Sequence, residues 1–407
     1  MTTEYRVLTP DDIEQSAYVE SVAFYNEPGP GRVEMAKKYL PPQWTVGAFL
    51  DGRLVADVRM VPMVRRINGG EMAFGAVGPV ACLSAYRRQG HVGRLLRFAL
   101  ETMRERGQVM SGLYTPHDAL YARYGWERAE GRLRHQFFPK DIHLRHRGAS
   151  GTIEQITKDD WERLDRIYQA HTAGRNGAFA RNAVWWQVAV LAHFESPGEL
   201  KDNDIFVWSS SEGRDEGYVV YSHRPLPQDK DWPRCVVHIR DFVALSGDAY
   251  SGLWQHMLTH DLAEYVVAYM PPDDPFPNLV HDPFRVQVSP GYGAMLRIVD
   301  VEQAIALRPC VGDRAVSFTM RILDHSAPWN EAIWRVETSK GRTQVEHTEA
   351  APDLELTANT MAPIFTGHMT PEVAAGVGLL RVFRTEAVGD MAEAFRVLYP
   401  PYSHDSY

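Results

Sequence analysis

The stretch Val80-Ala-Cys-Leu-Ser-Ala-Tyr-Arg-Arg-Gln-Gly-His-Val-Gly-Arg94 carries the strongest structural signal in the sequence. An apolar strand runs into Arg87-Arg88-Gln89-Gly90, and a helix follows from about Val92 to Arg106. The first turn of a helix leaves backbone N–H groups free and carries a partial positive charge, so it binds anions. Arginine adds charge-assisted hydrogen bonds, and glycine has no Cβ to keep a phosphate away. The stretch therefore predicts a pyrophosphate site; the alternative is a surface turn with solvated arginines.

The residues around this stretch predict alternating strands and helices. Thr9-Pro10-Asp11-Asp12 is typical of a helix N-terminus, with a cap, a proline and acidic residues in the first turn. Asp51-Gly52 between two apolar runs indicates a tight β-hairpin. The predicted order is β-α-β-β-β-α-β-α-β-β, with strands at 5–8, 45–50, 53–62, 72–83, 109–114 and a pair within 127–138, and helices near 9–24, 92–106 and 119–124.

The pattern partly recurs farther along the chain. Residues 140–151 are rich in His, Arg and Gly and indicate a boundary. A second α/β pattern follows, with helices near 159–171, 182–193 and 250–262. From Val299 the strands come first and the helices after, as in α+β domains. The predicted fold class is therefore α/β and α+β.

Composition and charge narrow the classes of function. The chain has 407 residues, 44% apolar and 23% charged, which is ordinary for a globular protein. With 43 Lys and Arg against 52 Asp and Glu the net charge is −9, whereas a nucleic-acid surface needs basic residues. The sequence contains no apolar window long enough to predict a membrane span, and its N-terminus does not have the pattern of a signal peptide. The three cysteines form no CxxC pair, which fits a reducing compartment. We expect a cytoplasmic protein that binds neither nucleic acid nor membrane.

A second motif, Leu120-Tyr-Ala-Arg-Tyr-Gly-Trp126, lies C-terminal to the first. Together the two resemble the GNAT superfamily of acyl-CoA-dependent N-acetyltransferases. The acyl-CoA motif of that superfamily is (Gln/Arg)-x-x-Gly-x-(Gly/Ala), and its later motif is Tyr-x-x-x-Gly-(Phe/Tyr/Trp). The matching residues are Arg87 and Gly90 for the first, where Val92 replaces the final glycine and Gly93 follows, and Tyr121, Gly125 and Trp126 for the second.

Nearly the whole chain resembles one subfamily, the enhanced intracellular survival (Eis) acetyltransferases. The resemblance implies a catalytic GNAT domain at 1–142, a second, degenerate GNAT-like domain at 143–296, and a sterol-carrier-protein-like domain at 297–407. In the second domain Asp248 precedes the helix at Tyr250 where a basic loop would be needed, so we expect this domain to be structural and pocket-forming. The stretches that resemble central-domain signatures are Arg181–Trp186, Val243–Tyr250, Pro272–Pro275 and Leu296–Val301.

The resemblance also implies roles for single residues. Tyr121 would be the general acid, and the C-terminal carboxylate, here that of Tyr407, would be the general base. Phe24, Tyr25 and Glu27, at the end of the first helix, are candidates for the acceptor pocket; Trp185-Trp186 is either core or a further pocket wall. The residues implied to hold acetyl-CoA are Val80 and Cys82 for the pantetheine arm and Arg87, Arg88, Gly90 and His91 for the pyrophosphate.

The chemistry agrees with these roles. An amine with a pKa of about 10 is mostly protonated at neutral pH, so a nearby carboxylate can accept its proton. A departing thiolate, with a thiol pKa of about 8.5, can take a proton from a tyrosine hydroxyl. Tyr124 is a competing acid with the wrong spacing to Gly125, and His117-Asp118 is a competing base. Cys82 lies in an apolar strand without an activating base, so we interpret it as a small hydrophobic residue.

The predicted protein is therefore an acetyl-CoA-dependent N-acetyltransferase that acts on a small-molecule primary amine. The histidines show no metal-binding spacing, so no metal is predicted. The resemblance implies a homo-oligomer, a hexamer. The alternative is a non-catalytic acyl-CoA or lipid-binding sensor, which the sterol-carrier-like domain suggests.

Overall fold

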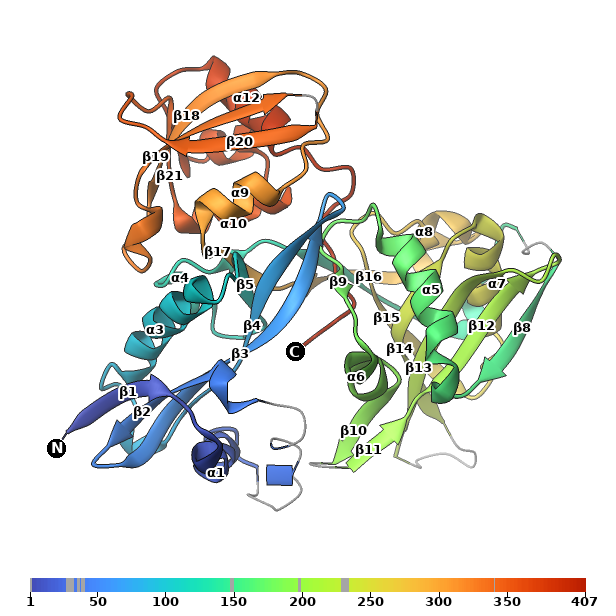
Figure 1. The fold of residues 1–407 in the computed structure, drawn as a ribbon. Coiled ribbons are helices and arrows are strands. Elements are labelled where there is room, and N and C mark those ends of the chain that lie inside the picture. Colours follow the sequence, from blue (N-terminus) through green and yellow to red (C-terminus); the bar gives the residue numbers. More distant parts are fainter. Residues whose placement is uncertain are drawn as a thin grey trace. The chain divides into compact units, whose positions relative to one another are not determined.

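The computed structural model describes residues 2–26, 33–34, 37, 41–146, 150–196, 199–227, 234–339 and 341–407. The chain forms two compact units. The first consists of Met1–Glu130, Gly293–Leu398 and Tyr407, and the second of Gly131–Tyr292 and Tyr399–Ser406. Colours follow the sequence in Figure 1, so each unit contains segments of distant colour.

The first sheet of unit 1 has the strand order β1-β2-β3-β4-β5-β17-β6. Neighbours from β1 to β4 are antiparallel, whereas β4 and β5 are parallel. The hairpin predicted at Asp51-Gly52 joins β2 to β3, with both residues at positive φ. The strands are β1 (Thr3–Val7), β2 (Thr45–Leu50), β3 (Arg53–Ile67), β4 (Gly70–Cys82), β5 (Met110–Leu113), β17 (Met295–Ile298) and β6 (Glu127–Arg128).

Helices cover both faces of this sheet. The capping box of Thr9 and Asp12 starts the turn that leads into α1 (Ile13–Ala23), which packs through Val19 on Ala81 of β4 and on Leu83 just after that strand. The other face receives α3 (His91–Glu105), whose buried residues form one apolar stripe. A short helix, α4 (Asp118–Ala122), follows β5. The apolar side chains of α3 that fill the core are Leu95, Leu96, Ala99, Leu100 and Met103.

Unit 1 also contains a five-stranded sheet of order β20-β19-β18-β21-β22. Its strands are β18 (Val316–Leu323), β19 (Ile333–Ser339), β20 (Arg342–His347), β21 (Leu354–Thr357) and β22 (Leu380–Val382), of which β22 was not predicted. The accompanying helices are α9 (Val301–Leu307), α10 (Ala358–Thr366), α11 (Pro371–Gly376) and α12 (Glu386–Ala394).

Unit 2 is built on a seven-stranded sheet of order β16-β7-β15-β14-β13-β12-β8, with β10 (Ala192–Ser196) and β11 (Glu199–Asp202) as a separate pair. Its strands are β7 (Gly131–Phe137), β8 (Gly151–Ile156), β12 (Asp204–Ser210), β13 (Asp215–Pro225), β14 (Cys235–Ala244), β15 (Ala263–Met270) and β16 (Gln287–Tyr292). The helices that matter below are α5 (Trp161–Thr172) and α7 (Gly247–Met257).

The helix predicted at 182–193 is shorter than expected. After α6 (Ala183–Trp185) the backbone widens into a π-helical turn over Trp186–Val190, in which the Leu191 N–H donates to the Trp186 carbonyl. The chain then enters β10. The fully buried Trp186 ring packs edge-on against Tyr168 and Tyr218, so tertiary packing decides this turn.

Two strands belong to different sheets from those expected. β7, predicted as the last strand of the first domain, pairs with β15 and β16 in unit 2. β17, which overlaps the supposed central-domain signature Leu296–Val301, pairs with β5 and β6 in unit 1. An apolar or alternating pattern predicts that a strand exists but not which strand it pairs with. The domain limits at 142 and 296 stay a prediction.

Candidate active site

The separation of β4 from β5 opens the first sheet near its centre. The two strands pair only from Phe74 opposite Met110 to Ala76 opposite Gly112, and β4 then continues to Cys82 paired with β3 but not with β5. A bulge at Gly78-Pro79 lies just beyond the last pair and shifts the register of β4 against β3. Bulges bend a strand and redirect its backbone groups. The side of β4 that β5 leaves is therefore available to a ligand.

Val80 and Cys82 direct backbone groups to this side. The Leu83 N–H donates to the Val55 carbonyl of β3 at 3.0 Å. Because successive N–H groups of a strand point in opposite directions, those of Cys82 and Val80 point away from β3. An extended ligand with amide groups can pair here as an additional strand. Burial raises the pKa of the Cys82 thiol, in keeping with a packing role for that side chain.

The loop after β4 leads into the N-terminus of α3. Arg88 and Gly90 both have positive φ, 62° and 86°, and a Cβ added to Gly90 would meet no atom within 4 Å. Arg87 stabilises the loop, because its guanidinium donates to the carbonyls of Cys82 (3.2 Å) and Ala23 (3.4 Å). The Arg88 side chain is exposed. Free N–H groups of the first turn and an exposed guanidinium are groups that can bind an anion.

His91 contributes to this site differently from the other loop residues. Its side chain is buried, and its Nδ1 lies 2.9 Å from the Tyr5 hydroxyl of β1. Burial lowers the pKa of the imidazole, so the ring is neutral at physiological pH. The backbone N–H at the start of α3, rather than the side chain, is therefore the group of His91 suited to a phosphate.

Tyr121 and Tyr124 lie in different surroundings. Tyr121, on α4, is buried in the same apolar cluster as Val77 and Cys82 of β4. This burial raises its pKa, so the phenol stays protonated and can act as an acid. The Tyr124 hydroxyl instead lies against Gly93 of α3, where a Cβ would clash with it. The two candidate acids therefore differ in surroundings: the Tyr121 side chain packs beside β4, whereas the Tyr124 hydroxyl packs against α3.

Tyr407 lies along the β4–β5 pair. Its hydroxyl is 2.8 Å from the position of a Cβ on Gly112, and its ring makes edge contacts with Phe74 and Tyr114, at centroid distances of 6.1 and 5.3 Å. Its main-chain oxygen is 3.9 Å from the position of a Cβ on Gly78, at the bulge. The main chain of Tyr407 therefore reaches the point where β4 and β5 separate.

A buried ion pair lies beside these aromatic rings. Arg65 of β3 bonds to Glu130, and both side chains are inaccessible to solvent. Glu130 also accepts a hydrogen bond from the Tyr114 hydroxyl at 3.3 Å. The electrostatic influence of Glu130, Tyr407 and Tyr114 raises the pKa of Arg65, although burial opposes this shift. Sequence reasoning missed this group, because an arginine in an alternating strand gives no sign of being buried.

The residues before Tyr407 are held firmly within unit 2. The Tyr402 N–H donates to the Asn176 carbonyl at 3.0 Å. Asp405 accepts from Arg181 Nε at 3.0 Å and from Trp185 Nε1 at 2.7 Å, and the Arg181 guanidinium also bonds to Asp241 at 2.5 Å. Arg181, Asp241 and Asp405 are almost fully buried. These bonds fix the position of residues 402–405, and Trp185 contributes to them through its hydrogen bond to Asp405.

The remaining candidates are spread over the first helix and the region after β5. Phe24 and Tyr25 are exposed at the end of α1, whereas Glu27 lies outside the described residues. Asp118 forms an ion pair with Arg128 through two hydrogen bonds of 2.7 and 2.6 Å, so its carboxylate already has a charged partner.

Across the described ranges no group of three His, Cys, Asp or Glu side chains could hold a metal. No helix among those same residues is long and apolar enough to cross a membrane.

Comparisons with known proteins identify all three parts of the chain. Residues 4–129 and residues 177–298 each match an Acetyltransferase (GNAT) domain family, and residues 301–403 match the Sterol carrier protein domain family. An uncharacterized N-acetyltransferase of Streptomyces griseus is 24% identical over the full length of both chains. N-acetyltransferase Eis of Mycobacterium tuberculosis is 21% identical over 84% of this chain and 82% of its own.

Solved structures agree with this assignment at the level of the fold. A GCN5-related N-acetyltransferase from Anabaena variabilis superposes with a TM-score of 0.87 at 18% identity, covering 100% of both chains. Eis1 from Mycobacterium abscessus superposes with a TM-score of 0.82 at 23% identity, covering 99% of this chain and 100% of its own. The fold class predicted from the sequence is confirmed. The chain is an Eis-like member of the GNAT superfamily, an acetyltransferase with two GNAT domains followed by a sterol carrier protein domain.

Proposed function

We propose that this protein transfers an acetyl group from acetyl-CoA to a primary amine of a small molecule. The observation that carries the proposal is the opening between β4 and β5. It combines outward backbone groups at Val80 and Cys82, the N-terminus of α3, the buried phenol of Tyr121 and the main chain of Tyr407. These are the groups that acyl transfer from a thioester requires.

The cofactor would bind along β4 and the loop after it. The pantetheine amides would pair with Val80 and Cys82, and the pyrophosphate would meet the backbone N–H groups from Arg88 to His91 together with the Arg88 guanidinium. Arg87 would act mainly by holding the loop, since it already donates to two carbonyls. A metal has no part in this mechanism, because the charge of the pyrophosphate is met by the helix terminus and by arginine.

The reaction would proceed by direct attack. The amine nitrogen attacks the thioester carbonyl, and the α-carboxylate of Tyr407 takes its proton, directly or through water. A backbone N–H of β4 stabilises the oxyanion. The carbon–sulfur bond then breaks, and the CoA thiolate takes the proton of Tyr121. The raised pKa of Tyr121 supports this role, because the phenol is protonated when the thiolate departs.

The acceptor remains defined only by class. Exposed Phe24 and Tyr25 at the end of α1 are proposed to line its entrance, with Glu27 as an anionic partner for the amine. A homo-oligomer, specifically a hexamer, and a cytoplasmic location stay predictions. A sensor that binds acyl-CoA without turning it over is the alternative, and a panel of amines assayed for release of free CoA separates the two functions.

Tyr121→Phe tests the general acid. The variant should bind acetyl-CoA normally and lose turnover by ~10²–10⁴-fold, because the hydroxyl acts only as the thiolate leaves. Tyr124→Phe is the matched control and should retain most of its turnover, since that hydroxyl lies against α3. Normal turnover in Tyr121→Phe together with loss in Tyr124→Phe would assign the acid to Tyr124.

Replacing Arg87 and Arg88 by alanine tests the pyrophosphate site. Charge-assisted hydrogen bonds contribute ~1.5–3 kcal/mol each, so CoA affinity should fall about tenfold or more. Arg53→Ala, which removes an exposed arginine at the start of β3, should leave affinity unchanged. Equal CoA affinity in the natural protein, the double variant and Arg53→Ala would show that the two arginines of this loop do not contribute to CoA binding.

An extension after Tyr407 tests the base. Two added glycines move the carboxylate away from Gly78, so turnover should fall while CoA affinity persists. Full turnover of the extended protein would exclude the carboxylate and direct attention to His117 or to a water held by backbone carbonyls.

A further inference from the structure

Unit 2 repeats the opening of the first sheet. β14 and β15 are parallel and pair only as far as Ile239 opposite Ala268, while β14 continues to Ala244. α7 then follows β14, as α3 follows β4. The second GNAT domain therefore has the same separated pair of parallel strands at its centre.

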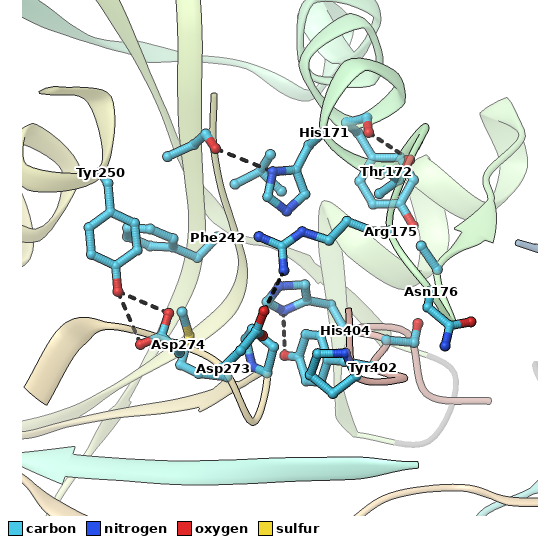
Figure 2. Close-up of a pocket in the computed structure, with 18 of the residues that line it drawn as sticks. His171, Thr172, Arg175, Asn176, Phe242, Tyr250, Asp273, Asp274, Tyr402 and His404 are labelled. Atoms are coloured by element: carbon cyan, nitrogen blue, oxygen red, sulfur yellow. Dashed lines mark hydrogen bonds and ion pairs between the residues drawn. The ribbon is translucent and has the colours of Figure 1, made fainter. Parts of the chain in front are cut away.

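A cavity of about 170 Å³ occupies this opening. Its walls come from the end of β14, from α5, from the loop 271–275 and from the chain segment 400–404, as Figure 2 shows. Residues 245–246, which connect β14 to α7, include no arginine, and Asp248 lies in the first turn of α7. An acid at that place repels a pyrophosphate, so the cavity is unsuited to CoA.

Asp274 is a buried carboxylate of this cavity that forms no ion pair with a Lys or Arg of the described residues. Its side chain is only 3% exposed, and its oxygens accept from the Tyr250 hydroxyl at 3.0 and 2.9 Å and from the Phe276 N–H at 3.1 Å (Figure 2). Among the described residues, the basic side chain within ion-pair distance of Asp274 is His135, whose Nδ1 lies 3.8 Å from Asp274 Oδ1. Burial lowers the pKa of His135 to about 4, so its ring is neutral. Burial raises the pKa of Asp274 to about 6, although the hydrogen bonds from Tyr250 and Phe276 and the more distant charge of Arg175 oppose this shift.

The other charged groups of the cavity are balanced or neutral. Arg175 pairs with Asp273 at 3.1 Å, and its guanidinium lies 4.3 Å from the centre of the Tyr399 ring. His171 lines the cavity as a neutral ring, since burial lowers its pKa to about 4. Burial also lowers the pKa of His404, which lies on the side of the cavity formed by the chain segment 400–404. The remaining net charge of the cavity is therefore the negative charge of Asp274.

Aromatic rings complete the lining. Phe242 and Tyr250 meet edge to face at 5.4 Å, and Tyr402 lies on the side formed by the chain segment 400–404. Aromatic faces attract cations, and desolvation strengthens that attraction. For scale, a dry cavity of about 150 Å³ accepts benzene. The space thus suits a compact ligand with an apolar body.

We propose that this cavity binds a small organic cation, an ammonium group on a short apolar or aromatic stem, with its nitrogen on the Asp274 carboxylate and its stem between Phe242, Tyr250 and Tyr402. The site is independent of acetyl transfer at β4. Because Tyr402, Ser403 and His404 form one wall, the bound cation also adds stability to the segment that leads to Tyr407.

Titration calorimetry with benzylamine, in the absence of acetyl-CoA, tests the site. Benzyl alcohol is the matched neutral probe of the same shape. Benzylamine should bind about tenfold more tightly or better, because only its ammonium forms a charge-assisted bond. Equal affinities for the two probes would overturn the proposal, and this comparison needs no variant protein.

Variants and hydrogen exchange then locate the bound cation. Asp274→Asn keeps an acceptor for Tyr250 and should lose benzylamine affinity about tenfold or more. Asp273→Asn, which alters the acid already paired with Arg175, should change it by less than about threefold. Benzylamine should slow amide exchange over 270–276 and 400–406. Undiminished binding in Asp274→Asn, or slowed exchange confined to the β4–β5 region, would instead assign the amine to the acetyl-acceptor pocket.

Discussion

Asp57, on β3, is a fully buried carboxylic acid in the first sheet. The Ser16 hydroxyl donates to one of its oxygens at 2.6 Å, and the other oxygen has no hydrogen-bond partner among the described residues. Burial, with the nearby charge of Glu20, raises the pKa of Asp57 to about 8. Arg59 does not neutralise it, because that guanidinium bonds to Glu20. Sequence analysis gave no sign of this acid, since a lone aspartate in a strand is usually a surface residue.

This raised pKa predicts a pH-dependent stability. A carboxyl group with a pKa near 4 when unfolded and near 8 when folded holds its proton more tightly in the folded state, so stability falls as pH rises through this window. Asp57→Asn removes the effect, and its gain in urea midpoint over the natural protein should grow from pH 5 to pH 8 and then level off. Parallel midpoints across that range would contradict the assigned pKa.

Asp12→Asn is the matched control for that measurement. Hydrogen bonds from Arg6, at 2.7 and 2.9 Å, lower the pKa of Asp12 to about 2. Its stabilising effect is therefore lost only as pH falls below about 4, the reverse sign. Between pH 5 and pH 8 this variant should be less stable than the natural protein by a constant amount.

At the scale of elements, local sequence patterns were sufficient to predict helices and turns, but not which strands pair with each other. The helix after Gly90, the hairpin at Asp51-Gly52 and the cap at Thr9 were predicted, because each depends on residues that are neighbours in sequence. The bulge at Gly78-Pro79 was not predicted, since it depends on how β4 meets β3. The opening of the sheet is likewise a property of two strands together. The pyrophosphate loop could therefore be proposed from the residues themselves, whereas the roles of Val80 and Cys82 beside it were implied only by the family resemblance.

The contact between α3 and the loop after α4 predicts a coupling between two motifs. A Cβ on Gly93 would clash with the Tyr124 hydroxyl. Gly93→Ala should therefore destabilise by ~1–3 kcal/mol through overpacking, despite a gain of roughly 0.5–1 kcal/mol in helix propensity. Tyr124→Phe removes the hydroxyl and should restore stability in the double variant. Additive effects of the two changes in a denaturation cycle would show that the contact is absent.

At the scale of the whole molecule, the compact units do not follow the order of the sequence. The linear division into three domains agrees with the order of the family matches but does not show that β17 completes the first sheet. Nor could sequence show why Gly125 is needed in the Tyr121 motif. Its φ is +88°, and a Cβ would clash with the guanidinium of Arg297, which comes from β17. The motif thus has a packing requirement that is set far along the chain.

Arg297 connects three parts of unit 1, and this leads to the last prediction. Its guanidinium bonds to the Tyr124 carbonyl, lies 5.6 Å from the centre of the Trp126 ring, and forms two bonds of 2.7 and 2.8 Å with Asp324 just after β18. Both charged side chains are almost fully buried. Removing one partner of such a pair leaves an uncompensated charge and costs ~3–5 kcal/mol. Arg297→Met should therefore lower the stability of the first sheet and of the sterol carrier protein domain together.

Hydrogen exchange can test this joint effect directly. In Arg297→Met, amides of β6 and of β18 should both lose protection, because one side chain supports both segments. Arg321→Ala is the matched control: it removes a half-exposed arginine of β18 that pairs with Glu355 at 3.2 Å, and surface pairs contribute only ~0–1 kcal/mol. Protection lost in β18 alone would mean that the carrier domain is stabilised independently of the acetyltransferase motif. Loss in both, with the control unchanged, would mean that the motif holding the proposed acid depends on the C-terminal domain for its stability.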